Sequence, residues 1–250
     1  MIILGLDSSA VSASCAIVEK EGTTPQKVLA CAAVNVKITH SQTLMPLVAN
    51  TLKTAGMSFN DIDAFAVSNG PGSFTGLRIS VSAVKGMAFA SDGKPVCGVS
   101  TLLSLAHNLV EARASTSNGI LACAVMDARR GEVYNALFDV NGETITRLTP
   151  DRAISLKDLG MELAQFNSEK REIVLVGDGA ELAHNQLLPD NCRLLIAPSA
   201  KRYQNAVSVC FAAEKFADVK EIMPVYIRQP QAEREREERK EKEHIQGVKK

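Results

Sequence analysis

Residues 70–78 read Gly70-Pro71-Gly72-Ser73-Phe74-Thr75-Gly76-Leu77-Arg78, and this glycine-rich stretch joins two apolar patterns. The pattern before it, Ala64 to Ser68, predicts a buried strand, and the pattern after it, which continues to Ala90, predicts a helix. Backbone N–H groups at the start of such a helix can face an anion. The stretch therefore predicts either a phosphate-binding loop or a tight turn between a strand and a helix.

Ordinary P-loop chemistry is not expected at this turn. A P-loop carries a lysine and then a serine or threonine after its last glycine. Here Gly76 is followed by Leu77 and Arg78. An anion at this position would have to be held by backbone amides and hydroxyl groups.

The apolar residues in the rest of the chain alternate between strand and helix periodicity, which is typical of an α/β fold. Ser41 stands where it would cap the first predicted helix. The predicted strands cover Ile2 to Leu6, Ser14 to Lys20, Val28 to Val36, Ala64 to Ser68 and Pro95 to Val99, and the predicted helices cover Ser41 to Thr54, Thr75 to Ala90 and Thr101 to Ala114.

The chain repeats a pattern at an interval of 120 residues. Asp7, Ala16 and Gly22 correspond to Asp127, Ala136 and Gly142, and residues 173–180 repeat the strand-to-glycine-turn pattern of residues 65–72. Such internal similarity predicts two related halves. Halves of this kind, each with an aspartate at the end of its first strand, describe an actin-like (ribonuclease-H-like) α/β fold in which each half is a mixed sheet flanked by helices. The predicted domains are residues 1–114 with about 200–228, then 119–199, followed by a tail over 229–250.

An actin-like fold makes the strand ends and glycine turns candidates for contact with an anion. In that architecture paired carboxylates and two hairpins hold the phosphates of a nucleotide and its magnesium ion. For Asp7 the alternative is a structural carboxylate that accepts hydrogen bonds from neighbouring N–H groups. The candidate residues for a vestigial phosphate or anion contact are Asp7, Ser8, Ser9, Gly70, Gly72, Ser73, Thr75, Asp127, Gly177 and Gly179.

Composition and charge narrow the class of protein. The chain has 250 residues, 46% of them hydrophobic, without an apolar run near the ~20 residues of a membrane span, and it lacks a basic leader, so we expect a cytoplasmic protein. Lys and Arg number 28, as do Asp and Glu, so no net field attracts nucleic acid. The six cysteines never form C-x-x-C, which favours reduced thiols over zinc ligands or disulfides.

The histidines do not form a catalytic or metal-binding motif. His40, His107, His184 and His244 lie on separate segments, and neither H-E-x-x-H nor G-x-S-x-G occurs. We therefore expect no metal site and no independent catalysis. The alternative is an enzyme of the same superfamily, either an ATP-dependent phosphotransferase or a metallopeptidase (glycoprotease).

Several motifs together resemble the TsaB (YeaZ) family. They are Ile3-Leu4-Gly5-Leu6-Asp7-Ser8-Ser9, His40-Ser41-Gln42-Thr43-Leu44-Met45-Pro46, the stretch from Ser68 to Ile79, Asp127-Ala128-Arg129-Arg130-Gly131-Glu132-Val133-Tyr134 and the closing Pro224-Val225-Tyr226-Ile227-Arg228. The resemblance covers roughly residues 1 to 228, and its most specific part is the glycine stretch.

The resemblance implies a noncatalytic subunit that binds and activates TsaD in the formation of N6-threonylcarbamoyladenosine at the adenosine next to the tRNA anticodon. It implies TsaD and the ATPase TsaE as partners, and a homodimer that competes with TsaD. Contact with tRNA is expected only through the complex. No cofactor is expected, except for a nucleotide at the boundary with TsaD.

The resemblance also implies that the helices over His40 to Lys53 and Thr75 to Ala90 bind the partner. Small residues recur near one face of the second helix, where they would let another helix approach closely or would pack on the protein's own sheet. The predicted partner-binding residues are His40, Leu44, Leu47, Val48, Thr51, Gly76, Arg78, Ser80, Ala83, Gly86, Met87 and Ala90.

The end of the chain is almost wholly charged. Residues 231–242 mix acidic and basic side chains and lack an apolar stripe. Such a segment is either a solvated single helix or a disordered tail, and its mixed charge makes a nucleic-acid arm the less favoured alternative.

Overall fold

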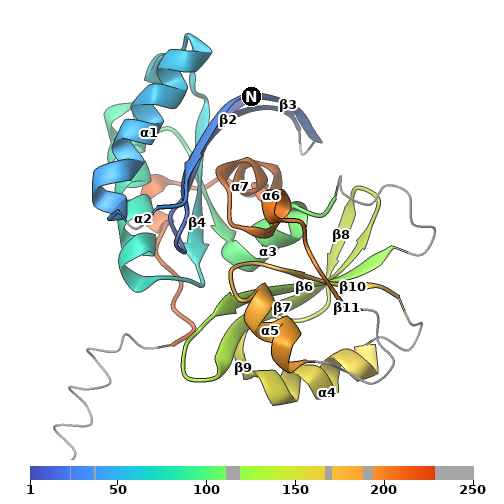
Figure 1. Cartoon of the computed structure of the whole chain (residues 1–250). Helices are drawn as coiled ribbons and strands as arrows, with labels where there is room; N and C mark the ends of the chain where they lie inside the picture. Colours follow the sequence, from blue (N-terminus) through green and yellow to red (C-terminus); the bar gives the residue numbers. More distant parts are fainter. Residues whose placement is uncertain (23, 37, 111–118, 167–170, 188–193, 229–250) are drawn as a thin grey trace, which may run out of the picture.

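The protein contains two mixed β-sheets, and helices cover their faces (Figure 1). The structure is a computed structural model and describes residues 1–22, 24–36, 38–110, 119–166, 171–187 and 194–228, so the predicted tail over 229–250 lies outside the described residues. The elements of the first half are β1 (Ile2–Asp7), β2 (Ala13–Glu21), β3 (Thr24–Val34), α1 (His40–Ala55), β4 (Ala64–Gly70), α2 (Phe74–Ala90), β5 (Val96–Ser100) and α3 (Thr101–His107). Those that follow are β6 (Ile120–Asp127), β7 (Glu132–Asn141), β8 (Thr144–Arg147), β9 (Arg152–Ser155), α4 (Leu156–Phe166), β10 (Ile173–Val176), α5 (Ala180–Gln186), β11 (Leu194–Ile196), α6 (Ser199–Arg202) and α7 (Ala206–Ala212), with short 3-10 turns at Phe59–Asp61 and Val219–Glu221.

The two sheets have the same topology, which confirms the predicted internal repeat. The first sheet has the order β3-β2-β1-β4-β5 and the second contains the order β8-β7-β6-β10-β11. In each, the first strand pairs antiparallel with the second and parallel with the strand that precedes the glycine turn. Gly22 and Gly142 end the second strands with φ of 58° and 59°, a conformation that favours glycine. The fold is therefore the predicted pair of actin-like halves.

Some predicted boundaries were wrong. The strand predicted from Val28 begins at Thr24, which pairs with Glu21 of β2. The first helix begins at His40 and is not capped by Ser41, whose hydroxyl lies inside the first turn and donates to the Thr39 hydroxyl. The helix predicted from Thr101 to Ala114 ends at His107, and residues 111–114 lie outside the described part of the chain.

The outer helices bury their apolar faces on the sheets. Residues of α1 and α2, among them Leu44, Val48 and Val81, pack with Leu4, Leu6 and Phe65 of the first sheet. In the second half, α4 and α5 pack in the same way on one face of the second sheet. Complete burial of a leucine or valine side chain contributes about 1.5–3 kcal/mol, so these faces hold each helix in place.

A middle layer formed by α3 and α7 joins the halves. α3 follows β5 of the first sheet, yet its Leu102 and Leu105 pack on the second sheet, while Val209 of α7 packs on the first. Asn108, which follows α3, also contacts the chain before α7, since its amide donates to the carbonyl oxygens of Lys201 and Tyr203 at 2.9 Å each. Its own carbonyl oxygen accepts hydrogen bonds from the side chains of Asn205 and Ser208. Each sheet is therefore packed against a helix that belongs to the other half of the sequence.

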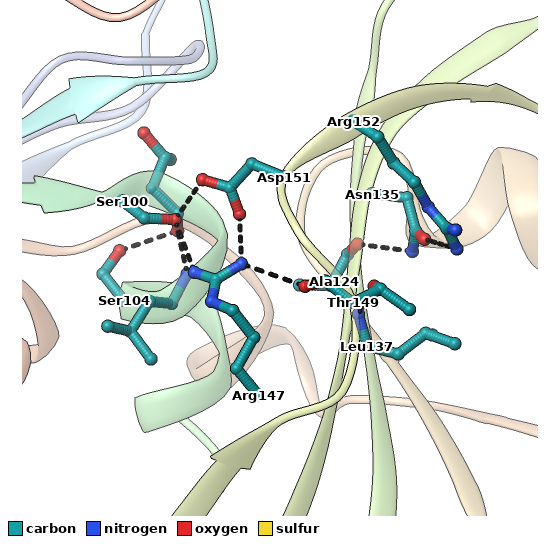
Figure 2. A network of polar contacts seen from close by, with 11 residues as sticks. Ser100, Ser104, Ala124, Asn135, Leu137, Arg147, Thr149, Asp151 and Arg152 are labelled. Carbon is teal, nitrogen blue, oxygen red and sulfur yellow. Dashed lines mark hydrogen bonds and ion pairs between the residues drawn. The ribbon is translucent and has the colours of Figure 1, made fainter. Parts of the chain in front are cut away.

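A polar network outside the middle layer also crosses between the halves (Figure 2). Ser100, at the end of β5, donates its hydroxyl proton to the Asp151 carboxylate at 2.6 Å and accepts a hydrogen bond from Arg147 at 3.1 Å. Arg147 and Asp151 also form an ion pair with each other. Because Ser100 belongs to the first sheet and both charged residues follow β7, the network fixes the end of β5 to the second half.

Within the described residues the five cysteines are free thiols, of which Cys31 is exposed and the others are buried. Cys192 lies outside that part of the chain. None of the helices in the described residues combines the length and the apolar content that a membrane span requires.

His107, at the end of α3, gives a test of the middle layer by pH. Burial lowers its pKa from 6.5 to about 4, with a smaller contribution from the Lys20 charge. A histidine with a lowered pKa is neutral in the folded protein, so stability is complete above pH 6.5 and declines as the pH falls toward 4. We expect a loss of about 2 kcal/mol by pH 4.5, discounted for partial exposure of the ring.

The measurement is urea unfolding of the wild type and His107→Gln at pH 7.0, 5.5 and 4.5. The difference between their unfolding free energies should shift in favour of the variant as the pH falls. Parallel pH profiles would show that His107 does not titrate below its ordinary range.

Candidate functional site

A cleft of about 630 Å³ opens between the two halves. It is lined by the β1–β2 hairpin, the glycine stretch, the end of β6 with the hairpin that follows, and the last described segment of the chain. The lining residues are Ser9, Ala10, Val11, Pro71, Gly72, Ser73, Phe74, Thr75, Met126, Asp127, Ala128, Arg129, Tyr134, Asp178, Val225, Tyr226, Ile227 and Arg228. Of the predicted anion contacts, the cleft brings together Ser9, Gly72, Ser73, Thr75 and Asp127.

Asp7 is a structural carboxylate that does not line the cleft. It is fully buried, and one of its oxygens accepts hydrogen bonds from the N–H and the hydroxyl of Ser9, both at 2.8 Å. The other oxygen accepts the hydroxyl proton of Ser68 on β4. Burial raises the pKa of Asp7, and these hydrogen bonds oppose that change. The geometry therefore fits the second interpretation of Asp7, in which the carboxylate organises its own hairpin.

Asp127 repeats this arrangement at the end of β6. Its carboxylate accepts a hydrogen bond from the N–H of Arg129 at 2.7 Å, two residues on, as Asp7 does from Ser9. This local turn is common for aspartate and leaves the side chain exposed here. The two aspartates are thus equivalent in the repeat, but only Asp127 reaches the cleft.

Asp178, which the sequence analysis did not single out, is a further acidic residue at the cleft. Burial raises its pKa, and the charges of Asp127 and Asp7 raise it further. Its carboxylate accepts a hydrogen bond from the Gln204 side chain at 3.0 Å. The signal available in the sequence was its position between Gly177 and Gly179. Carboxylates at this end of the cleft repel a phosphate group that is not accompanied by a cation.

The glycine stretch is packed against the chain and does not form an open cradle. A Cβ atom on Gly72 would lie 2.4 Å from the Ser9 carbonyl oxygen, and one on Gly76 would lie 2.0 Å from that of Ser8. The N–H of Ser73 donates to the Ser9 carbonyl oxygen at 2.7 Å, and the N–H of Gly76 donates to the Ser73 hydroxyl at 3.3 Å. These two amides and the space beside both glycines are therefore not available to a phosphate group.

The remaining glycines of the predicted set also serve packing. A Cβ on Gly70 would lie 2.2 Å from the Val225 carbonyl oxygen, and one on Gly177 would lie 2.0 Å from that of Val125. Gly179 donates its N–H to Val125 at 3.2 Å. Ser8 is fully buried and donates its hydroxyl proton to the Gly76 carbonyl oxygen at 2.9 Å.

The segment Val225 to Arg228 forms one wall of the cleft, a role that was not predicted from the sequence. Tyr226 packs on Phe74 with ring centroids 4.8 Å apart, and its hydroxyl accepts a hydrogen bond from Arg78 at 2.9 Å. Arg228 reaches the second half, where it donates to the Ala128 carbonyl oxygen at 3.0 Å and pairs with Glu132. No periodicity marks such a segment, so only a resemblance could draw attention to it.

The predicted partner-binding residues do not all lie on a surface, which corrects that prediction. The sheet-facing side of α1 and α2 contains Leu44, Val48, Thr51, Gly76, Ser80 and Met87, which are buried. Leu47 and Ala83 are partly buried against the same core, and His40 is partly buried and bonded to the Ala10 carbonyl oxygen at 2.6 Å. The physical reason is that these apolar and small positions face the protein's own sheet.

The outer face of α2 is what remains for a partner. It consists of the exposed residues Arg78, Ser82, Gly86, Phe89 and Ala90. Phe89 is 73% exposed, and a Cβ on Gly86 would meet no atom within 4 Å. Phe89 was missed in the sequence analysis, although a phenylalanine three residues after Gly86 on this face was a usable signal.

Metal ligands do not gather at the cleft or elsewhere in the described residues. In that part of the chain, no three histidine, cysteine, aspartate or glutamate side chains lie close enough together to bind a metal ion. His40, His107 and His184 belong to different helices, α1, α3 and α5, and His244 lies outside the described residues.

Two related halves that face each other across a cleft, each with an aspartate ending its first strand, define an actin-like protein. The family model for TsaD, tRNA N6-adenosine threonylcarbamoyltransferase, matches residues 33–239. TsaB of Escherichia coli, a tRNA threonylcarbamoyladenosine biosynthesis protein, is 32% identical over 76% of this chain and 80% of its own length. The chain belongs to the TsaB (YeaZ) family.

A second curated relative agrees with this assignment, and a solved structure agrees with the fold. TsaB of Bacillus subtilis is 29% identical over 93% of this chain and 96% of its own length. The solved structure of YeaZ from Pseudomonas aeruginosa has a TM-score of 0.72 at 23% identity and covers 90% of this chain and 99% of that chain. At 23% identity, the similarity to the solved YeaZ structure supports the fold alone.

Proposed function

We propose that this chain is a noncatalytic subunit in the biosynthesis of threonylcarbamoyladenosine in tRNA, and that it binds and activates TsaD. The curated relatives carry the name of that pathway, and the TsaD family model matches most of the chain. TsaE and a second copy of this chain are the further partners of the proposal. The observation that carries it is the outer face of α2.

The outer face of α2 has two features that contacts within the described residues do not explain. Gly86 lies inside a helix, where glycine costs about 1 kcal/mol relative to alanine. Nothing within the described residues requires the missing side chain, since a Cβ there would be in open space. Three residues further on, Phe89 is largely exposed. A partner helix that approaches closely at Gly86 and covers Phe89 accounts for both.

The cleft supports the noncatalytic part of the proposal. Its glycine stretch is packed against the β1–β2 hairpin, and the Asp7 carboxylate is buried and bonded within its own hairpin, so neither is free to act on a bound nucleotide. The chain alone is therefore expected neither to hydrolyse ATP at a rate that depends on Asp7 nor to modify tRNA. An ATPase rate of the chain alone that is lost in a folded Asp7 variant would support the alternative of an independent phosphotransferase.

The test of the proposal is pairing with TsaD by a variant on the outer face of α2. Gly86→Trp fills the open position with a bulky ring, so we expect affinity for TsaD to fall at least about 100-fold, close to 2.7 kcal/mol. The same variant should lose tRNA modification in a mixture with TsaD, TsaE and the threonylcarbamoyl-adenylate donor. Titration calorimetry measures the first effect and modified nucleoside analysis the second.

A matched control is Met161→Trp, because Met161 is 54% exposed on α4 of the other half. It should pair as the wild type does. Wild-type affinity of a folded Gly86→Trp variant would remove this face from the interface. Self-association is proposed to use the same face, so a complex that contains TsaD and also keeps the homodimer contact would contradict that part.

A further inference from the structure

The last described segment, residues 222–228, spans from α2 to the second half of the protein, and we name it the strap. In Figure 1 it is the red segment that leaves the first half and runs to the hairpin after β6. Four of its residues, Val225 to Arg228, line the interdomain cleft. The strap therefore touches both the candidate site and the helix proposed to face the partner.

The first-half end of the strap is held by β4 and α2. The Val225 N–H donates to the Asn69 carbonyl oxygen at 2.6 Å, and the Asn69 amide donates to the Met223 carbonyl oxygen at 3.2 Å. Lys85 on α2 donates to the Ile222 carbonyl oxygen at 3.0 Å. This end moves with α2 and with the strand that leads into the glycine stretch.

Tyr226 ties the strap to the start of α2. Its hydroxyl accepts from Arg78, whose guanidinium lies 3.8 Å from the centre of the Phe74 ring. Arg78 is an exposed residue on the same outer face as Gly86. A partner that covers that face therefore contacts α2, the helix that is hydrogen-bonded to the strap.

The second-half end of the strap is held through the Arg228 side chain. Arg228 donates to the Ala128 carbonyl oxygen and forms an ion pair with Glu132, so it contacts both sides of the hairpin between β6 and β7. The Arg228 side chain is 16% exposed and that of Glu132 is 41% exposed, so solvent screens this ion pair only in part. The hairpin carries Asp127 and Arg129, which line the cleft.

We infer that the strap couples the position of α2 to the width of the interdomain cleft. A displacement of α2 moves Arg78, and through Tyr226 it moves the segment whose Arg228 holds the second-half hairpin. Occupancy of the outer face of α2 and access to the cleft are then linked through one chain segment. The link itself lies within this chain, and only the identity of the element that displaces α2 rests on the proposed function.

The test uses hydrogen exchange of the hairpin amides, residues 127–132, in the free full-length protein. Tyr226→Phe removes only the hydroxyl that contacts Arg78 in the first half, yet it should raise exchange in the hairpin at least about threefold. Arg228→Ala should raise it about tenfold. The control Lys220→Ala, exposed in the turn before the strap, should leave hairpin exchange unchanged. Unchanged hairpin exchange in a folded Tyr226→Phe variant would overturn the inference.

A second arm adds the partner of the proposed function at saturation. Hairpin exchange in the wild type should change at least about threefold on complex formation, and the change should disappear in Arg228→Ala although the complex still forms. A complex that forms without any change in the hairpin would overturn the coupling. Failure of the wild type to form a complex would instead count against the proposed function, and the free-protein arm would still decide the inference.

Discussion

Asp7→Ala lowers the unfolding free energy by about 3 kcal/mol at pH 7, because it leaves three buried hydrogen-bond donors without their acceptor. These donors are the N–H and hydroxyl of Ser9 and the hydroxyl of Ser68, all of which bond to the Asp7 carboxylate. The loss is measured by urea unfolding. It exceeds the effect of an ordinary surface substitution, since Asp7 joins β1, the following hairpin and β4.

Asp7→Asn is the matched variant. An asparagine oxygen can accept both hydrogen bonds from Ser9, and the Ser68 hydroxyl can rotate to accept from the new amide. Because burial raises the pKa of Asp7 above 3.8, the ionised wild-type carboxylate costs stability at neutral pH, and that cost disappears as the pH falls below 3.8. We therefore expect Asp7→Asn to be at least as stable as the wild type at pH 7, with an advantage that shrinks toward pH 4.

The two variants separate the interpretations of Asp7. A structural carboxylate predicts a severe loss for alanine and little or none for asparagine. Equal loss in both variants would show that the negative charge itself is needed, as it would be for a bound cation. An alanine variant as stable as the wild type would contradict the hydrogen-bond network.

The repeat could be predicted from the sequence because its signals are local. Asp7 and Asp127 end strands of the same apolar pattern, and Gly22 and Gly142 mark the turns that end the second strands. Strand and helix periodicity follows from which side chains face a sheet, so the outer helices were also predictable. The packing of α3 on the second sheet was not, since α3 lies within the predicted first domain and its local pattern does not indicate which of the two sheets its apolar side chains contact.

The candidate site was harder to predict for a physical reason. A glycine beside a helix start indicates either an exposed amide or a close backbone contact, and the sequence pattern is the same for both. Only the position of the Ser8 and Ser9 carbonyl oxygens shows that this stretch makes contacts. In the same way, small residues on α2 indicate either a partner or the protein's own sheet, and the structure divides them between the two faces of the helix.

Gly76 and Gly86, two glycines of the same helix, should respond to alanine with opposite signs. Gly76→Ala places a Cβ 2.0 Å from the Ser8 carbonyl oxygen, and the backbone shift that this forces should cost about 3 kcal/mol of unfolding free energy, even after the helix propensity gained. Gly86→Ala meets no atom, so it should stabilise the chain by about 0.5–1 kcal/mol. Urea unfolding of both variants against the wild type measures the pair.

The affinity for TsaD gives a second test of Gly86→Ala. If a partner helix approaches closely at Gly86, the methyl group that stabilises the free chain also fills space at the interface, so Gly86→Ala should weaken pairing with TsaD while it raises stability. A variant that gains stability and loses affinity cannot owe the loss to unfolding. Unchanged affinity in the stabilised variant would mean that the outer face of α2 is not approached closely at this residue, and a stable Gly76→Ala would mean that the glycine stretch is not held against the β1–β2 hairpin.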